Sequence, residues 1–455
     1  MEVKKENEKH VNKMGTMPIG KLLSSMAWPA ILSMTINALY NIVDSIFVAM
    51  INEDALTAVS LILPIQMLMI SLAVGSGVGV NSLIARRLGA RKFDDANKAA
   101  SISLRIAFFN YILFAIFGVF FATPFIKAYS DNPYIVENGI SYLKIITIFS
   151  VFIMFQIIFE KVLQATGNMI APMLISLSGA ITNIILDPIL IFGLLGFPEL
   201  GVAGAAIATV IGQAFAMFVA VIIVFRKEHQ VKIQLKGFKM DWSIVKDIYI
   251  VGLPSIIMQS VASVMLIGYN AILATVSTTA VAVLGCYNKL QSFVFMPVFG
   301  LNQGAMPIMG YNFGAKDKHR LMETYKKALL VAIIVMALGT MLFQLIPVQL
   351  LKLFSASDEM IAMGVPALRL ISLCFVPAAF GIINATFFQG TGHGVYSLVA
   401  SILRQLVGIL PIAYVLVKYA GISISWASFP LAEIIGLVYS LVMMKILYKK
   451  EIKNL

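Results

Sequence analysis

The sequence predicts an all-α polytopic membrane protein with twelve transmembrane helices in two parallel six-helix bundles. Three observations predict it: the composition, the number of long apolar runs and an internal repeat. Hydrophobic residues make up 60% of the 455-residue chain, charged residues 12%, and the mean hydropathy is +0.91. A soluble domain typically carries about a quarter charged residues. Most of this chain's surface must therefore face a bilayer.

The apolar runs account for the number of helices. A membrane span needs about 20 mostly apolar residues. Runs of that length are separated by short turn-like segments rich in Gly, Pro, Asn and Asp. They cover residues 24–50, 55–85, 96–123, 140–165, 172–195, 201–225, 244–275, 278–310, 327–354, 363–389, 396–417 and 422–447.

Basic residues predict how these helices are oriented. Lys and Arg are concentrated in the N-terminal tail, the loops at 86–92 and 316–320, the central linker and the C-terminal tail. The alternate connections contain only Lys127, Lys352 and Lys418. By the positive-inside rule, both termini and the linker are cytoplasmic. Since the net charge of +12 lies at the ends of apolar runs and not on one face, we expect no nucleic-acid partner.

An internal repeat divides the chain into halves. With a displacement of 225 residues, Pro29 aligns with Pro254 and Gly79 with Gly304, and LGARK and LQATG align with FGAKD and FQGTG. Two halves with six helices each start on the same side of the membrane and form a parallel repeat. The expected domains are a cytoplasmic tail at 1–21, an N-lobe at 22–230, a linker at 231–243, a C-lobe at 244–447 and a cytoplasmic tail at 448–455.

An ionisable side chain inside a span is costly and indicates function. In the first apolar run, Asn37, Tyr40, Asn41 and Asp44 follow each other at helical spacing and form one polar stripe. In the fifth run, Asp187 follows Asn183 by one turn.

We expect Ser176 to extend the stripe that ends at Asp187, and Pro188 to weaken the helix beside the acid. A carboxylate in a site of low dielectric constant has its charged form disfavoured, so it can bind a proton. The alternative is that each acid is a structural hydrogen-bonding group.

Other charges inside the spans have less regular patterns. Gln156, Glu160 and Gln164 form a further stripe in the fourth run. In the second half we expect structural roles for the ionisable residues Lys289, Arg369, Arg404 and Glu433. The positions displaced by 225 from Asp44 and Asp187 hold Tyr269 and Ile412, so we expect the coupling chemistry mainly in the first half.

The chain resembles the multidrug and toxic compound extrusion (MATE) family over nearly its whole length. The resemblance rests on Pro29 with Asp44, on LQATGN at 163–168, NIILDP at 183–188 and GVAGAAIAT at 201–209. Within the family the chain is most similar to the proton-coupled DinF-type and MepA-like bacterial branch.

The resemblance implies roles for single residues. Asp44 and Asp187 would be the cation or proton pair, with Tyr40, Asn183 and Thr209 as neighbours, and helix one would bend at Pro29. Further candidates to line a cavity are Asn37, Asn41, Gln156, Glu160, Gln259 and Ser263. The sodium-coupled branch has an acid in helix seven where this chain offers Gln259 and Ser263. The expected coupling ion is therefore the proton, with sodium at Asp44 and Asp187 as the alternative, and no cofactor or other metal is expected.

The implied function is secondary active efflux of organic-cation drugs and dyes by antiport, through alternating access of two lobes. The protein would act as a monomer among the lipids of a bacterial plasma membrane and would not be an enzyme. Two alternatives stay open: a major-facilitator drug antiporter and a flippase for lipid-linked saccharides. An intramembrane enzyme is disfavoured because no HExxH or GxSG motif occurs in the sequence.

Overall fold

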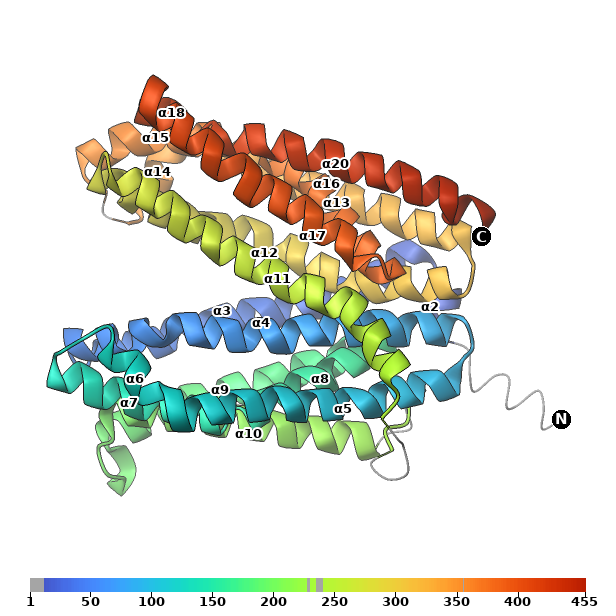
Figure 1. Ribbon diagram of the computed structural model, residues 1–455, viewed down its shortest axis with the longest axis horizontal. Coiled ribbons are helices and arrows are strands. Elements are labelled where there is room, and N and C mark those ends of the chain that lie inside the picture. The colour runs from blue at the N-terminus through green and yellow to red at the C-terminus, as the bar shows by residue number, and fades with distance from the viewer. Residues whose placement is uncertain (1–11, 227–229, 235–239, 355) are drawn as a thin grey trace. The chain divides into compact units, whose positions relative to one another are not determined.

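The fold consists of helices grouped in two compact units (Figure 1). The computed structural model describes residues 12–226, 230–234, 240–354 and 356–455; parts of the predicted N-terminal tail and linker lie outside these ranges. Unit 1 contains Asn12 and Leu32–Gly252, and unit 2 contains Lys13–Ile31 and Leu253–Leu455.

Most helices of unit 1 precede those of unit 2 in the chain; the exceptions are α2 and the start of α3, which belong to unit 2. Unit 1 contains the second part of α3 (Ile19–Ala49), then α4 (Glu53–Gly89), α5 (Phe93–Ile116), η1 (Phe117–Phe121), α6 (Ala122–Lys127), α7 (Pro133–Ile148), α8 (Val151–Ala165), α9 (Ile170–Phe192), η2 (Leu194–Gly196), α10 (Gly201–Arg226) and the start of α11 (Trp242–Ala274). Unit 2 contains α2 (Lys13–Thr16), the start of α3, the rest of α11, α12 (Thr278–Gly314), α13 (Lys318–Leu345), α14 (Pro347–Lys352), α15 (Asp358–Ser372), α16 (Phe375–Thr391), α17 (Gly394–Ile402), η3 (Leu403–Ile409), α18 (Leu410–Ala420), α19 (Ile422–Ser425), α20 (Ser428–Lys450) and η4 (Ile452–Asn454).

The helix lengths confirm the predicted fold class. Within the described residues, nine helices are long and apolar enough to cross a membrane, and two further spans are bent helix pairs, α7 with α8 at 44° and α15 with α16 at 46°. The one predicted span that is not among these eleven lies at 278–310. It corresponds to α12, which has 37 residues and contains the polar residues Asn288, Lys289 and Gln291. The predicted ends differ by several residues because the helices continue past their apolar segments into polar turns.

The repeat appears in the local geometry of the helix ends. The left-handed residues Gly167 and Gly392, with φ of 86° and 93°, follow α8 and α16 and lie 225 positions apart. A glycine adopts this conformation at a helix C-terminus without a Cβ clash. Asn52 and Ser277, also 225 apart, cap α4 and α12 by accepting hydrogen bonds from the backbone N–H three residues later, at 2.7 Å and 3.3 Å.

The compact units differ from the predicted lobes at two helices. The first part of α3, to Ile31, belongs to unit 2, and the first part of α11, to Gly252, belongs to unit 1. Glycines allow the close packing on these segments. A Cβ placed on Gly304 of α12 would lie 2.9 Å from the backbone nitrogen of Ala27, and one on Gly79 of α4 would clash with the backbone of Ile248. The aligned glycines therefore mark the same helix contact in each unit.

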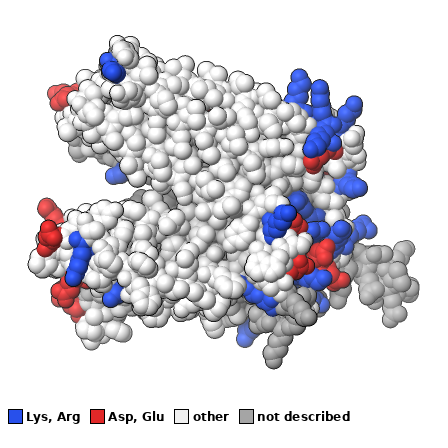
Figure 2. Space-filling view, viewed as in Figure 1, with Lys and Arg blue, Asp and Glu red and all other residues white. Residues whose placement is uncertain are grey.

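The surface of each unit is divided into polar ends and an apolar middle. Figure 2 shows a band without charged side chains between the charged helix ends of each unit. Large apolar side chains are exposed on the helices of both units, for example Leu39 and Ile46 of α3 and Leu338 of α13. Such extensive apolar exposure fits a surface that faces lipid. The chain is a multi-pass membrane protein.

Candidate functional site

The centre of the site lies where α9 and α10 pack against each other in unit 1. A Cβ on Gly212 of α10 would lie 2.8 Å from the carbonyl oxygen of Gly179 and 3.2 Å from the Cβ of Asn183. This small residue lets the two backbones approach closely. Thr209, one turn before Gly212, is thereby placed beside Asn183.

Asn183 connects the acid of α9 to α10. Its Nδ2 atom donates to Oδ1 of Asp187 at 3.2 Å and to Oγ1 of Thr209 at 3.4 Å. The spacing of Asn183 and Asp187 puts both side chains on one face of α9. Asp187 is 0% exposed and Asn183 2% exposed, so these bonds are made away from water.

The second part of α3 adds Tyr40 and Asp44 to this group. Val48 of α3 is buried in a cluster with Ile191 of α9, and the ring of Phe47 packs edge-on against Phe192 at 6.4 Å. One turn before these contacts, Asp44 lies close enough to Asp187 for one carboxyl group to act on the other. Tyr40, one further turn away, lies near both acids and near Thr209.

The site is rich in unpaired acceptor oxygens. Oδ1 of Asp44, Oδ2 of Asp187 and Oδ1 of Asn183 are buried and have no hydrogen-bond partner among the described residues. A buried acceptor without a partner is costly, so each such atom in a native fold requires an explanation. Three in one place suit a proton or a small cation with a preference for oxygen ligands. No group of three or more His, Cys, Asp or Glu that could hold a metal ion occurs among the described residues.

Two residues of the site were not expected from the sequence. Tyr142 of α7 is buried close to Asp44 and Tyr40, and it also lies near Gln66 of α4. Both residues lie in predicted spans, but neither belongs to a polar stripe. Only the packing of α4 and α7 against the site brings them to the acids.

The stripe of α8 forms a separate polar group. Oε1 of Glu160 accepts hydrogen bonds from Gln156 Nε2 and Ser176 Oγ, each at 3.1 Å. Ser176 lies three turns before Asp187 on the same face of α9, as the stripe predicts, but its hydroxyl group donates to Glu160 of α8 and not to the acid. Gln164 accepts a bond from Lys161 Nζ at 3.0 Å and so points to a different partner from Glu160.

The remaining candidates, all within the described residues, make no hydrogen bond to the acid group. The side chains of Asn37 and Asn41 are exposed, and Asn41 Nδ2 donates to the backbone oxygen of Asn37 at 2.8 Å. Gln259 and Ser263 are half-buried in unit 2, where Ser263 Oγ lies 3.5 Å from the Gln259 backbone oxygen. Pro29 is buried inside a helix that continues through it, and Pro188 lies inside α9 in the same way.

Unit 2 contains a counterpart of the acid group with different chemistry. Tyr269 takes the position of Asp44, and its hydroxyl group contacts Ser425 O at 3.3 Å and Ser428 Oγ at 3.2 Å. Arg404, in the π-helical segment η3, lies 225 positions after Gly179. A Cβ on Gly436 of α20 would lie 3.2 Å from the Cβ of Arg404, just as Gly212 approaches Gly179 in unit 1.

This glycine contact identifies Glu433 as the counterpart of Thr209, since each lies three residues before its glycine, at a displacement of 224 residues instead of 225. Glu433 Oε2 accepts from Arg404 Nη1 at 3.2 Å, and the two side chains are 6% and 29% exposed. Unit 2 thus places a base and an acid at the counterparts of Gly179 and Thr209, whereas the two acids of unit 1 have Tyr269 and Ile412 as their counterparts. The sequence indicated Arg404 and Glu433 as possible partners, but their pairing and their register depend on the packing of η3 against α20.

The comparisons with known proteins agree with this architecture. The MatE family model matches residues 29–189 and 254–415, two segments whose starts are 225 residues apart. The multidrug export protein MepA of Staphylococcus haemolyticus is 26% identical over 89% of this chain and 88% of its own length. An FAD transporter of Shewanella oneidensis is 26% identical over 87% of this chain and 88% of its own.

Solved structures extend the similarity to the fold. A multidrug resistance MATE family transporter in an outward-facing conformation superimposes with a TM-score of 0.89 at 28% identity, covering 96% of this chain and 98% of that one. A transporter of the MOP superfamily from Pyrococcus furiosus, described as having a binding pocket of reverse polarity, gives a TM-score of 0.86 at 27% identity with the same coverage. The duplicated family match and the similarity along the whole chain establish that this protein belongs to the MatE family of multidrug efflux transporters.

Proposed function

We propose that the chain exports organic cations and drugs by antiport with protons, through alternating access of its two lobes. The family membership supports transport and not a reaction catalysed in the membrane. The observation that carries the coupling proposal is the group of Asp44 and Asp187 with its unpaired buried oxygens.

The chemistry of the pair follows from its two states. Two carboxylates close together in an apolar surrounding cannot both hold a charge without cost, so the pair takes up a proton or a cation readily. When a proton is bound, the negative charge that would hold an organic cation is reduced. Proton and drug therefore compete, and this reciprocal linkage is the basis of antiport.

The neighbours of the pair have positioning roles in this proposal. Asn183 holds the carboxyl group of Asp187 by its Nδ2 donor, and Thr209 receives the second proton of that amide. Tyr40 lies beside both acids and supplies a hydroxyl group to whichever of them is ionised. Pro29 offers the point at which α3 bends, because proline removes one helical hydrogen bond. The proton is the preferred ion, and sodium bound by the same oxygens is the alternative.

Drugs are the proposed substrates because relatives named for multidrug export match over most of the chain, and because related MATE structures hold the compounds MaD3S and MaL6. The relative named as an FAD transporter indicates a second candidate, an anionic substrate. Two acids without a base in the unit 1 site favour a cation over an anion. The family match in both halves also argues against a major-facilitator antiporter.

Transport in energised vesicles tests the proposal. Variants Asp44→Asn and Asp187→Asn should lose most proton-driven uptake of a cationic dye into everted vesicles. Asp358→Asn, which changes an exposed acid at the start of α15, is the matched control and should transport like the unchanged protein. Dye-driven proton release that is intact in both site variants would refute the coupling role. Dependence on sodium instead of the proton gradient would identify sodium as the coupling ion.

A further inference from the structure

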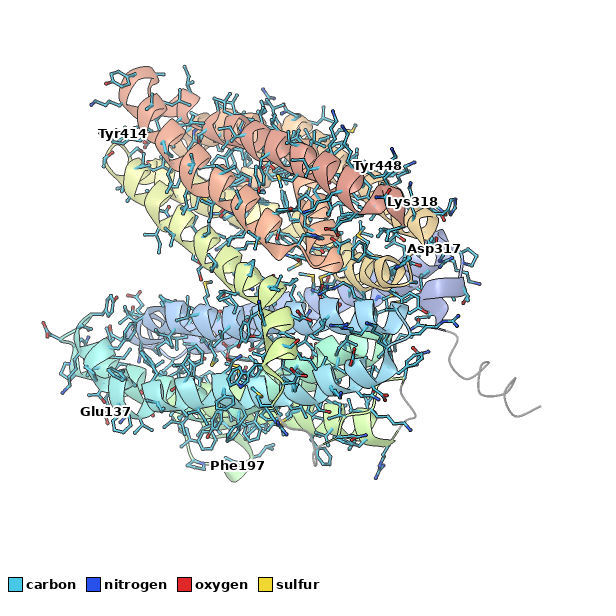
Figure 3. All side chains as sticks on the ribbon, turned by 45° about the vertical axis from the view of Figure 1, so that its right-hand side comes forward. Glu137, Phe197, Asp317, Lys318, Tyr414 and Tyr448 are labelled. Atoms are coloured by element: carbon cyan, nitrogen blue, oxygen red, sulfur yellow. The ribbon has the colours of Figure 1, made fainter. Side chains whose placement is uncertain are left out.

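A basic groove lies at one end of unit 2, apart from the acid site. It has a volume of about 920 Å³ and is formed mainly by the first turns of α13 and the end of α20. Figure 2 shows Lys and Arg gathered at this end of unit 2, and Figure 3 shows that Lys318 and Tyr448 lie close together there, at the opposite end from Tyr414.

The groove carries a net positive charge. Its lining contains Lys318, Lys326 and Lys327, one acidic side chain, Glu323, and the terminal carboxylate of Leu455. These groups sum to +1 with His319 neutral. Glu323 is engaged by Lys327 at 2.6 Å and approached by His319 at 4.0 Å, so it does not offset the other two lysines directly.

The other two lysines, Lys318 and Lys326, differ in their contacts. Lys318 Nζ donates to the backbone oxygen of Lys453 at 3.2 Å and lies 5.4 Å from the ring centre of Tyr448. These contacts connect the start of α13 to the end of the chain and fix one wall of the groove. Lys326 is exposed and has no hydrogen bond or ion pair with the described residues, so its ammonium group can turn towards a ligand.

The groove extends over the whole depth of the lipid headgroup region and somewhat beyond it. Lys326 lies immediately before the apolar segment of α13, while Lys318 lies eight residues earlier, about 12 Å along the helix axis. Headgroup regions occupy roughly 5 to 8 Å on each side of the hydrocarbon core. Tyr448 has the amphipathic ring that is typical of this level.

Apolar side chains continue from the groove towards the middle of the membrane. On α13, Leu330 and Ile334 are exposed, and on α20, Val442 and Ile446 are exposed. Below the groove, α13, α16 and α20 are connected by Tyr325, Asn384 and Ser440 through hydrogen bonds of 2.8 Å and 3.1 Å. A molecule with an anionic head and hydrocarbon chains would therefore meet complementary surfaces at both levels.

We propose that this groove binds the headgroup of an acidic phospholipid, with the phosphate between Lys318 and Lys326 and the acyl chains along α13 and α20. Acidic lipids attract basic clusters at the membrane surface, and a basic pocket between helices at the cytoplasmic level suits their headgroups. The site is independent of the proposed transport chemistry, because it shares no residue with the acid site.

Native mass spectrometry of the full chain, released from membranes of phosphatidylglycerol and phosphatidylcholine, tests this. The unchanged protein should retain phosphatidylglycerol preferentially. Each lysine near an acidic headgroup contributes about fivefold in affinity. Lys326→Gln should weaken retention by about fivefold and the double variant with Lys318→Gln by about 30-fold, while arginine at both positions should keep it.

The matched control is the pair Lys449→Gln and Lys450→Gln, which removes two exposed lysines at the end of α20 that do not line the groove. This control should retain the acidic lipid. An equal loss in control and groove variants would show only general surface attraction and would overturn the site. If the protein retains phosphatidylcholine equally well, the groove does not select acidic lipids and the proposal fails. If inorganic phosphate at millimolar concentration displaces the lipid completely, the ligand of the groove is phosphate and not a lipid. Lys326→Gln alone keeps the test valid if the Lys318 variant fails to fold.

Discussion

The ion pair of Arg404 and Glu433 offers a quantitative test of how unit 2 is held together. The variant Arg404→Gln removes the hydrogen-bonded partner of Glu433, a carboxylate that is only 6% exposed. Breaking a buried pair on one side typically costs about 3 to 5 kcal/mol, because an uncompensated charge is left inside. A proton can replace the lost partner. Protonating a glutamate with the ordinary pKa of about 4.3 at pH 7 costs about 3.7 kcal/mol.

Protonation of Glu433 limits how much stability the Arg404→Gln variant can lose, and it makes that loss depend on pH. We expect Arg404→Gln to lose up to about 4 kcal/mol of unfolding free energy at pH 7. The folded variant then binds one more proton than the unfolded chain, so its stability rises as the pH falls, by about 1.4 kcal/mol per unit. Near pH 5 most of the deficit should be gone. The double variant Arg404→Gln with Glu433→Gln should be close to the unchanged protein at every pH, since neither charge remains.

The two buried cysteines supply the assay. Cys286 and Cys374 are 9% and 5% exposed, so a maleimide dye reacts with them only on unfolding. Arg369→Gln, which changes an exposed arginine of α15, is the matched control and should follow the unchanged protein. The reasoning is refuted if Arg404→Gln unfolds like this control at pH 7, or if the double variant is as unstable as the single one.

Two further predictions concern the fold. Gly304→Leu should destabilise the protein by about 1 to 3 kcal/mol or prevent folding, because its Cβ would press on the backbone of Ala27. Gly285→Leu on the same helix, where nothing lies within 4 Å, should be tolerated in the same dye assay. A cysteine at Lys127 should react with a membrane-impermeant maleimide added to intact cells, whereas a cysteine at Lys92 should react only after the membrane is opened. The reverse pattern would overturn the predicted orientation.

The helices and the repeat could be predicted because their signals are local. Long apolar runs define spans without knowledge of their neighbours. Turn residues such as Gly167 and Gly392 repeat at a constant displacement because the same backbone conformation is needed at both places. The i, i+4 spacing of Asn183 and Asp187 similarly predicts one face of a helix, and the structure puts both side chains there.

Features that depend on packing between helices could not be predicted. The division of α3 and α11 between the two units has no counterpart in hydropathy, since both helices read as ordinary spans. Tyr142 reaches the acids only because α7 packs beside α3. Ser176 satisfied the spacing of one stripe, but the approach of α8 gave it Glu160 as a partner. Residues far apart in the sequence meet through contacts between helices, and the periodicity of a single helix does not predict these contacts.

The two units show how one scaffold can carry opposite polar chemistry. In unit 1, the acid site leaves acceptor oxygens without donors, including those of Asp44 and Asp187. In unit 2, the described buried side-chain atoms without partners are the hydroxyl group of Tyr287, Nε1 of Trp426 and Oε1 of Gln405, and Tyr287 lies near an acid already paired with Arg404. A site with spare acceptors gains from a proton or a cation, whereas a neutral acid–base pair would have to break before it could bind either. Because both sites stand on the same glycine-mediated helix contact, we expect this difference in side chains alone to confine the proposed ion coupling to unit 1.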